Sequence, residues 1–279
     1  MKISEIMTTA VCSITSDKSV SHAAEQMNEY STNYLVVVDN GELTGIVTSR
    51  HVATAHPNRI VADAMDMPLN RISPEHNVWD AHSQLLESDN DLLLVMDQEE
   101  LVGAVTREAI QIKLAEFLDP LTGLYRASYI HYIGEKLLLE NKPFHLLFID
   151  VNDFGQINKQ FGHPFGDDVI RRYSSVLSSL VVEQGDHLCR YAGDEFILIT
   201  TGPDSHVQQC IETIVRPTEM YHVTVSAAVG YIDGYREPNF LAQPLRELIA
   251  KASILSTEAK KKKSVSILTS LTKEQVGKE

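Results

Sequence analysis

Apolar and polar positions in the first part of the chain follow one pattern twice. Residues 5–52 align without a gap onto residues 63–110, at a constant offset of 58. Identical residues recur at matching places, among them Met7 and Met65, Ile14 and Ile72, Ala23 and Ala81, Gly45 and Gly103, and Thr48 and Thr106. A register that is kept across apolar runs and polar turns alike indicates a tandem structural repeat.

Each copy contains the same predicted elements in the same order. Apolar residues at three- and four-residue spacing predict a helix, and runs of β-forming residues before and after an acidic turn predict two strands. The helices are expected at 20–30 and 78–86, the first strands at 35–38 and 92–96, and the second strands at 45–48 and 103–106. One such unit cannot bury both faces of its strands, so we expect the two copies to cover each other.

A helix is predicted between the repeats and the rest of the chain, over residues 107–118. Its apolar stripe is Ile110, Leu114, Phe117 and Leu118, and Asp119–Pro120 ends it because proline disfavours helical geometry in the residue before it. Two interpretations stay open. The helix packs on its own domain, or it pairs with its twin in a homodimer and transmits the state of the repeats.

The second part of the chain alternates predicted strands with polar loops. An apolar strand at 144–151 contains Asp150, a strand at 190–200 is broken by Ala192–Gly193 before Asp194 and Glu195, and a further strand covers 223–231. Carboxylates at a strand end and on a tight turn are well placed to converge on one Mg²⁺ (or Mn²⁺) ion, which prefers oxygen ligands. The alternative for an acidic turn is a solvated hairpin. Asp150 weighs against it, because a carboxylate that closes an apolar strand needs a partner.

Composition narrows the class of protein. A length of 279 residues suits about two domains, and 43% hydrophobic residues suffice for ordinary cores. The formal charge of −14 argues against nucleic acid or an anionic membrane surface as partner. No apolar run approaches the ~20 residues of a membrane span, so no membrane insertion is expected. Three scattered cysteines and the absence of a signal-peptide pattern favour the cytoplasm.

The repeats resemble a CBS pair over residues 1–112, through the opening Ile6–Thr8, the acidic turns, and the endings Gly45–Thr48 and Gly103–Thr106. The resemblance implies an adenine nucleotide, AMP or ATP, between the copies. Its contacts would be the hydroxyls of Thr48 and Thr106 and the guanidinium groups of Arg50 and Arg107. The ribose-binding Asp of the family is replaced by His51 and Ala109. Alternatively, the two threonines are only favourable strand-end residues.

Residues 117–270 resemble the GGDEF family of diguanylate cyclase domains. The motifs are DPLTGLY at 119–125, FIDV at 148–151, IN…FGHPFGDD across 157–168 and AGDEF at 192–196. The resemblance implies an α/β (α+β) fold, in which a mainly antiparallel five-stranded sheet like the ferredoxin-like palm of nucleotidyl cyclases carries helices. It also implies a homodimer of facing sites that condenses two GTP into cyclic di-GMP and two pyrophosphates. Residues 271–279 would form a tail.

The same resemblance assigns the site residues. Asp150 and Asp194, with the Val151 carbonyl, would bind the metal, and Glu195 would assist the 3′-hydroxyl or a second metal. The remaining substrate contacts would be Asn158 and Asp167 to the guanine edge, His163 along the nucleotide, and Lys260 to phosphate.

Several positions depart from the family pattern. Ala192 replaces the first glycine of the signature, and the cations usual at three positions are replaced by Gly155, Ala127 and Ser264. Each missing cation could remove a charge-assisted hydrogen bond worth about 1.5–3 kcal/mol. Arg126 and Lys261 to Lys263 are nearby substitutes. The chain is therefore either a working cyclase regulated by its CBS pair, or a GTP-binding module that signals by conformation or partner binding.

A product-binding site of the RxxD type is not expected. Its Asp is present as Asp186, but its Arg position is Glu183. A glutamate cannot donate hydrogen bonds to the dianionic product. The alternative role of Asp186 is to shape the turn that precedes Arg190.

Overall fold

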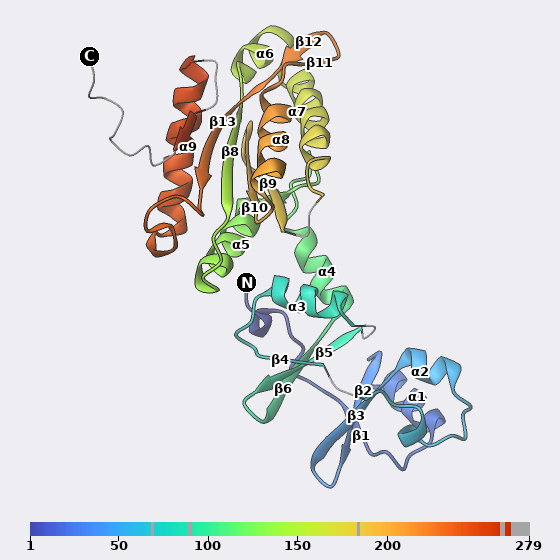
Figure 1. Cartoon of the computed structure of the whole chain (residues 1–279). Helices are drawn as coiled ribbons and strands as arrows, with labels where there is room; N and C mark the ends of the chain where they lie inside the picture. The colour runs from blue at the N-terminus through green and yellow to red at the C-terminus, as the bar shows by residue number, and fades with distance from the viewer. Residues whose placement is uncertain (68–69, 89–90, 183–184, 263–265, 269–279) are drawn as a thin grey trace, which may run out of the picture. The chain divides into compact units, whose positions relative to one another are not determined.

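The structure is a computed structural model, and it describes residues 1–67, 70–88, 91–182, 185–262 and 266–268 (Figure 1). The chain divides into two compact units, Met1–Glu116 and Phe117–Glu279. Each unit has its own hydrophobic core, so each is described by itself.

The first unit consists of two small sheets with matching topology. The first copy contains β1 (Ser13–Ile14), α1 (Val20–Glu29), β2 (Tyr34–Asp39), β3 (Glu42–Thr48) and α2 (Ser49–Thr54). The second contains β4 (Arg71–Ile72), α3 (Val78–Leu86), β5 (Leu92–Asp97), β6 (Glu100–Thr106) and α4 (Arg107–Ala115). The sheet orders are β1-β2-β3 and β4-β5-β6, each with one parallel and one antiparallel pairing. Both hairpins carry an irregularity at equivalent positions, after Val37 and after Val95.

The two copies cover each other reciprocally. Apolar side chains of β2, β3, β5 and β6 form one shared cluster, Tyr34, Val36, Ile46, Leu92, Leu94 and Ala104. The segment before each copy's first strand bonds to the other copy: Thr8 exchanges backbone hydrogen bonds with Ala104, and Asp66 with Ile46. A Cβ at Gly45 would lie 2.6 Å from Met65 Sδ, and one at Gly103 would lie 2.9 Å from Met7 Sδ. The repeated Met and Gly therefore meet across the copies, which explains why they recur together.

The helix that follows the second copy is shorter than the sequence predicts. α4 ends at Ala115, with Ile110 and Leu114 buried and α3 as its neighbour. Phe117 lies beyond the helix, and its carbonyl accepts a hydrogen bond from the Arg126 N–H. The prediction of a helix to residue 118 was wrong, because the chain there pairs with the segment after the Asp119 turn instead of continuing the helix.

The second unit is a six-stranded sheet with helices on both faces. Its strands are β7 (Tyr125–Arg126), β8 (His145–Val151), β9 (Asp186–Ala192), β10 (Glu195–Thr200), β13 (Ala227–Asp233) and β14 (Ser266–Leu268). Its helices are α5 (Ala127–Leu139), α6 (Phe154–Phe161), α7 (His163–Ser178), α8 (Asp204–Val215) and α9 (Leu245–Lys262). The order β14-β13-β8-β10-β9-β7 is antiparallel among the four long strands and parallel at both edges. Figure 1 shows the four long strands side by side.

The mainly antiparallel α+β class is confirmed, but the described residues form six strands in this sheet where five were expected. Within the described residues β7 has two residues and β14 has three, and these edge strands pair with the outer sides of β9 and β13. The single strand expected at 223–231 is also divided at Ser226. Its first part, β12 (Val223–Val225), pairs with β11 (Thr218–Met220) in a separate hairpin.

The central strand β8 is buried on both faces. Leu147, Ile149 and Val151 join the cluster that faces α7 and α8, whereas Leu146 and Phe148 join the cluster that faces α5 and α9. This double burial explains the uninterrupted apolar run in the sequence. It also fixes the strand rigidly, so that the polar residue near its end, Asp150, is held in a defined position.

Candidate functional site

Three carboxylates meet where β8 ends and the β9–β10 turn begins. The antiparallel register pairs Asp150 with Glu195, and the Val151 N–H donates to the carbonyl of Asp194 at 3.2 Å. Burial, and then the negative charge of Asp150, raises the pKa of both Asp194 and Glu195. A cation would therefore be stabilised here by partly buried oxygen donors that repel one another.

A lysine already occupies part of this corner. Lys260 in α9 donates from Nζ to Asp150 Oδ1 at 2.6 Å, with the two side chains 32% and 16% exposed. The ammonium group thus balances the charge of Asp150. The carboxylates of Asp194 and Glu195 remain close to each other without such a bond to Lys260. The donor set of Asp150 and Asp194 fits Mg²⁺ or Mn²⁺ chemically, provided that Lys260 releases Asp150.

The signature turn is held by Arg190 and Asp119, two residues that the sequence analysis did not assign to the site. Arg190 donates from Nε to the Gly193 carbonyl at 2.8 Å and from Nη1 to Asp119 Oδ1 at 2.9 Å. Burial opposes the ionised form of Asp119, but bonds from Arg190 and Thr122 outweigh it and lower the pKa of that carboxyl. Gly193 has a φ of +46°, which favours glycine. The DPLTGLY motif therefore supports the AGDEF motif directly.

Beside this turn is a shallow hollow of about 400 Å³ whose lining includes Arg126, Ala127, Arg190 and Gly193. Ala127 contributes no charge to it, whereas Arg126 is exposed at its edge. Lys261 is exposed, and it is the last residue of α9 whose side chain is described. Lys263 and Ser264 lie outside the described residues, as does the side chain of Lys262.

The expected guanine contacts lie at the junction of α6 and α7. Asn158 packs so closely on α7 that a Cβ at Gly166 would come within 1.9 Å of its Oδ1, which explains the glycine. Asn158 Oδ1 is buried without a hydrogen-bond partner, a costly state that a ligand donor would relieve. His163 and Asp167 are exposed in the first turns of α7. Gly155 is exposed in α6, and a Cβ there would meet nothing within 4 Å.

Asp186, the aspartate at the RxxD position, is turned inward. Asp186 is buried, and its Oδ2 accepts from the Val182 N–H at 3.0 Å and lies 2.9 Å from His206 Nε2. Its carboxylate is therefore used inside the fold. Glu183 lies outside the described residues.

A further cluster was missed by the sequence analysis. His145, Asp204 and Asp233 offer ligand atoms that all lie within 4.8 Å of one another, at the opposite end of β8 from Asp150. Arg236 donates to Asp233 at 2.8 Å and to Asp204 at 2.5 Å. A guanidinium thus already balances the two carboxylates, so the cluster is complete as a structural ion-pair network.

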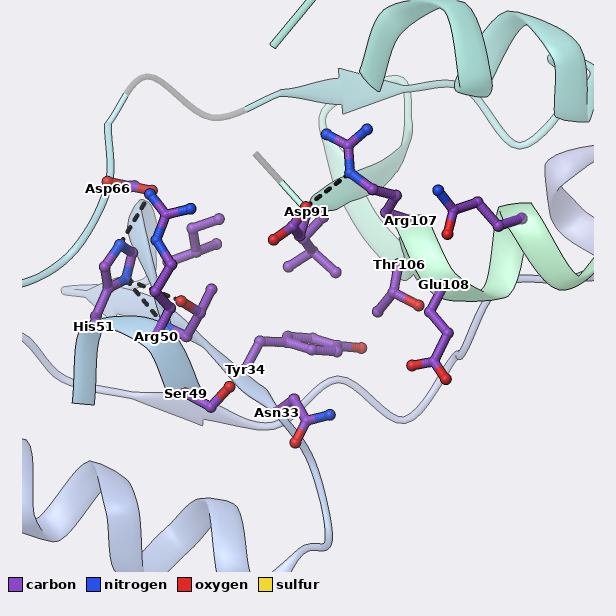
Figure 2. A pocket seen from close by; sticks show the side chains of 14 residues that line it. Asn33, Tyr34, Ser49, Arg50, His51, Asp66, Asp91, Thr106, Arg107 and Glu108 are labelled. Carbon is purple, nitrogen blue, oxygen red and sulfur yellow. Dashed lines mark hydrogen bonds and ion pairs between the residues drawn. The ribbon is translucent and has the colours of Figure 1, made fainter. Parts of the chain in front are cut away.

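The first unit contains a cavity of about 310 Å³ between the two copies (Figure 2). Thr48, Arg50, Thr106 and Arg107 all line it. Thr106 caps α4, since its Oγ1 accepts from the Ala109 N–H at 3.2 Å. Arg107 donates to Asp91 at 2.7 Å and to the Leu85 carbonyl at 2.9 Å.

Two replacements for the expected ribose carboxylate behave differently. His51 lines the cavity and lies between the Thr48 N–H, 3.1 Å from its Nδ1, and Asp66 Oδ2, 3.2 Å from its Nε2. Ala109 is absent from the lining.

Within the described part of the chain, no helix combines the length and apolar character that crossing a bilayer requires.

These features define a two-part protein with an acidic corner on a mainly antiparallel sheet and a cavity between two repeats. The family profile described as "Diguanylate cyclase, GGDEF domain" matches residues 116–266, and the profile of the CBS domain matches residues 3–58. The chain therefore belongs to the GGDEF family, with a CBS region before the GGDEF domain.

Among curated proteins, the chain is similar to the response regulator PleD of Caulobacter vibrioides, with 33% identity over 134 residues, 42% of this chain and 29% of the relative. It is also similar to the diguanylate cyclase VdcA of Vibrio cholerae, with 25% identity over 170 residues, 57% of this chain and 48% of the relative. The chain thus spans less than half the length of either relative.

A solved structure of the coiled coil and GGDEF domain of DgcB from Caulobacter crescentus, in complex with c-di-GMP, is also similar. It has 18% identity and a TM-score of 0.48, over 58% of this chain and 91% of that one.

Proposed function

We propose that this protein is a diguanylate cyclase, which acts as a homodimer and condenses two GTP into cyclic di-GMP and two pyrophosphates. The observation that carries the proposal is the corner of Asp150, Asp194 and Glu195, in which two carboxylates have raised pKa values beside a lysine. Such a corner fits a reaction that brings phosphate charge and a divalent cation together.

In this reaction Asp150 and Asp194 would hold Mg²⁺ or Mn²⁺, with the Val151 carbonyl beside them. A bound cation would polarise the phosphate and offset its charge. Glu195 would accept the proton of the 3′-hydroxyl, and its raised pKa suits a general base. The hydroxyl oxygen bonds to the α-phosphorus of the facing GTP, and pyrophosphate leaves. Lys260 would move from Asp150 to a phosphate oxygen.

The base would be held at α6 and α7. Asn158 would offer its buried Oδ1 to a guanine donor, which removes the cost of leaving that oxygen unpaired. Asp167 would accept from the N1 and N2 donors of guanine, and His163 would line the nucleotide. Both are exposed and therefore reachable.

The test is direct. The purified chain is incubated with GTP and Mg²⁺, and the products are separated by chromatography. We expect cyclic di-GMP, its loss in Asp194→Ala, and normal turnover in Glu212→Ala, which changes an exposed carboxylate on α8. The rate per subunit should also fall on dilution. The uncharged positions Gly155 and Ala127 favour the alternative, a GTP-binding signalling module, and GTP binding without any product would identify it.

We also propose that the cavity of the first unit binds an adenine nucleotide that regulates the cyclase. Thr48 and Arg50 are available contacts, whereas the bonds of Arg107 to Asp91 and to the end of α3 make it a positioning residue. Calorimetry of the full chain with AMP and ATP tests this proposal. No heat with either nucleotide would contradict it.

A further inference from the structure

The repeat relates the two walls of the cavity between the CBS copies to each other. The charges on these two walls nevertheless differ. At the offset of 58, Arg50 corresponds to Glu108, and Thr48 to Thr106. All four residues line the same cavity. Figure 2 shows Arg50 and Glu108 on opposite sides, with the ring of Tyr34 between them. Equivalent positions therefore carry opposite charges across one cavity.

The other polar groups of the lining already have partners in the wall, but not all of their charges are balanced. Arg107 forms an ion pair with Asp91, Nε to Oδ1 at 2.7 Å, so its charge is balanced within the wall. His51 accepts the Thr48 N–H at Nδ1, which places the ring proton on Nε2, where it faces Asp66 at 3.2 Å. A neutral imidazole leaves the negative charge of Asp66 in the lining.

Arg50 is different from these groups. It is exposed and takes part in no ion pair among the described residues. It is therefore the cation of the lining that a ligand anion can use without breaking an internal bond. Glu108 is also exposed, and with Asp66 it makes the rest of the lining unfavourable for further negative charge.

From this asymmetry we propose that the cavity takes one ligand in one orientation, with a single phosphate at Arg50 and hydrogen-bond donors, hydroxyl or amine, toward Glu108. The ligand class is a nucleoside monophosphate, and longer phosphate chains are selected against. The proposal rests on the proposed binding of an adenine nucleotide. The volume of about 310 Å³ agrees with it, because it lies at the lower end of the ~300–1,000 Å³ typical of ligand sites.

The experiment is calorimetry of the full chain with AMP, ADP and ATP. Affinity should fall along this series, by about fivefold or more from AMP to ATP, the effect of one close pair of like charges even in water. Glu108→Arg would make the two walls alike, and it should raise ATP affinity more than AMP affinity. Glu99→Arg, in the exposed β5–β6 turn, makes the same change in net charge outside the cavity and should leave the ratio unchanged.

Arg50→Gln supplies the second arm. This variant should lower the affinity for AMP about tenfold or more, because a hydrogen bond to a charged group is lost. The affinity for adenosine should stay unchanged. Equal affinity for AMP and ATP, or an identical response to Glu108→Arg and Glu99→Arg, would overturn the orientation and the phosphate count alone. No binding of any of the nucleotides would overturn nucleotide regulation as well.

Discussion

Replacing Lys260 with Met should separate two effects of its ammonium group. In the structure this group is bonded to Asp150 at 2.6 Å and so occupies the carboxylate that a divalent cation needs. The variant should therefore bind Mn²⁺ more tightly in the absence of GTP. With GTP present, the same lysine is proposed to bind phosphate, so turnover should decrease.

The size of the second effect follows from one charge-assisted hydrogen bond. Losing about 1.5–3 kcal/mol lowers the rate about 10- to 150-fold. Because both side chains are partly exposed, the gain in metal affinity is smaller, on the order of a few-fold.

Mn²⁺ binding is measured by electron paramagnetic resonance without nucleotide, and turnover by chromatography. Lys251→Met is the matched control, because Lys251 lies on the same helix and contacts Gln243 away from the acidic corner. If Lys260→Met changes neither quantity relative to Lys251→Met, the ammonium group does not exchange between Asp150 and substrate. Weaker Mn²⁺ binding in the variant would refute the competition itself.

Three further predictions address single residues. Gly155→Lys should increase turnover several-fold, since a side chain there meets no obstacle and restores a phosphate cation; unchanged kinetics would place the phosphates elsewhere. Burial and neighbouring charges raise the pKa of Glu195, so the folded state holds its proton longer than the unfolded state and stability declines as pH rises from the unfolded toward the folded pKa. Thermal unfolding should therefore show Glu195→Gln more stable than the parent at neutral pH, with the difference vanishing in acid. Micromolar cyclic di-GMP should leave the initial rate unchanged, and product inhibition that Asp186→Ala abolishes would contradict this. Asp186→Ala should lower the free energy of unfolding by about 1–3 kcal/mol because it removes the buried partner of Val182 and His206, and an unchanged free energy of unfolding would contradict that expectation.

Patterns that repeat or that cover many residues could be read from the sequence. The alignment of the two copies supported the strands predicted in each of them. The apolar run of β8 placed Asp150 at the end of a strand. The edge strand β7 could not be predicted, because two residues are too few to show an alternating pattern. The helix at 107–118 was overextended, since its apolar spacing continues past Ala115 into residues that pair with another segment.

Contacts between side chains that are far apart in the sequence could not be predicted either. The ion pair of Arg190 with Asp119 joins two motifs that the sequence analysis treated separately. The bond between Lys260 and Asp150 was missed for the same reason, although both residues were expected at the site. The orientation of Asp186 could not be predicted either, because Asp186 begins β9 whereas its partner His206 lies on α8. A residue's type and place in a motif indicate what it can bind, but not which neighbour it binds in the folded chain.

The reciprocal pairing of the two repeat copies has a consequence for how the protein folds during synthesis. Thr8, near the start of the chain, has its hydrogen-bonding partner at Ala104, and Met7 packs against Gly103. The first copy therefore cannot reach its final packing on the ribosome until nearly the whole unit has been synthesised. Until then its apolar strand face and its opening segment are exposed to neighbouring nascent chains. The opening segment of one chain could make the same contacts with the second copy of another chain, so we expect domain-swapped dimers as one misassembled form.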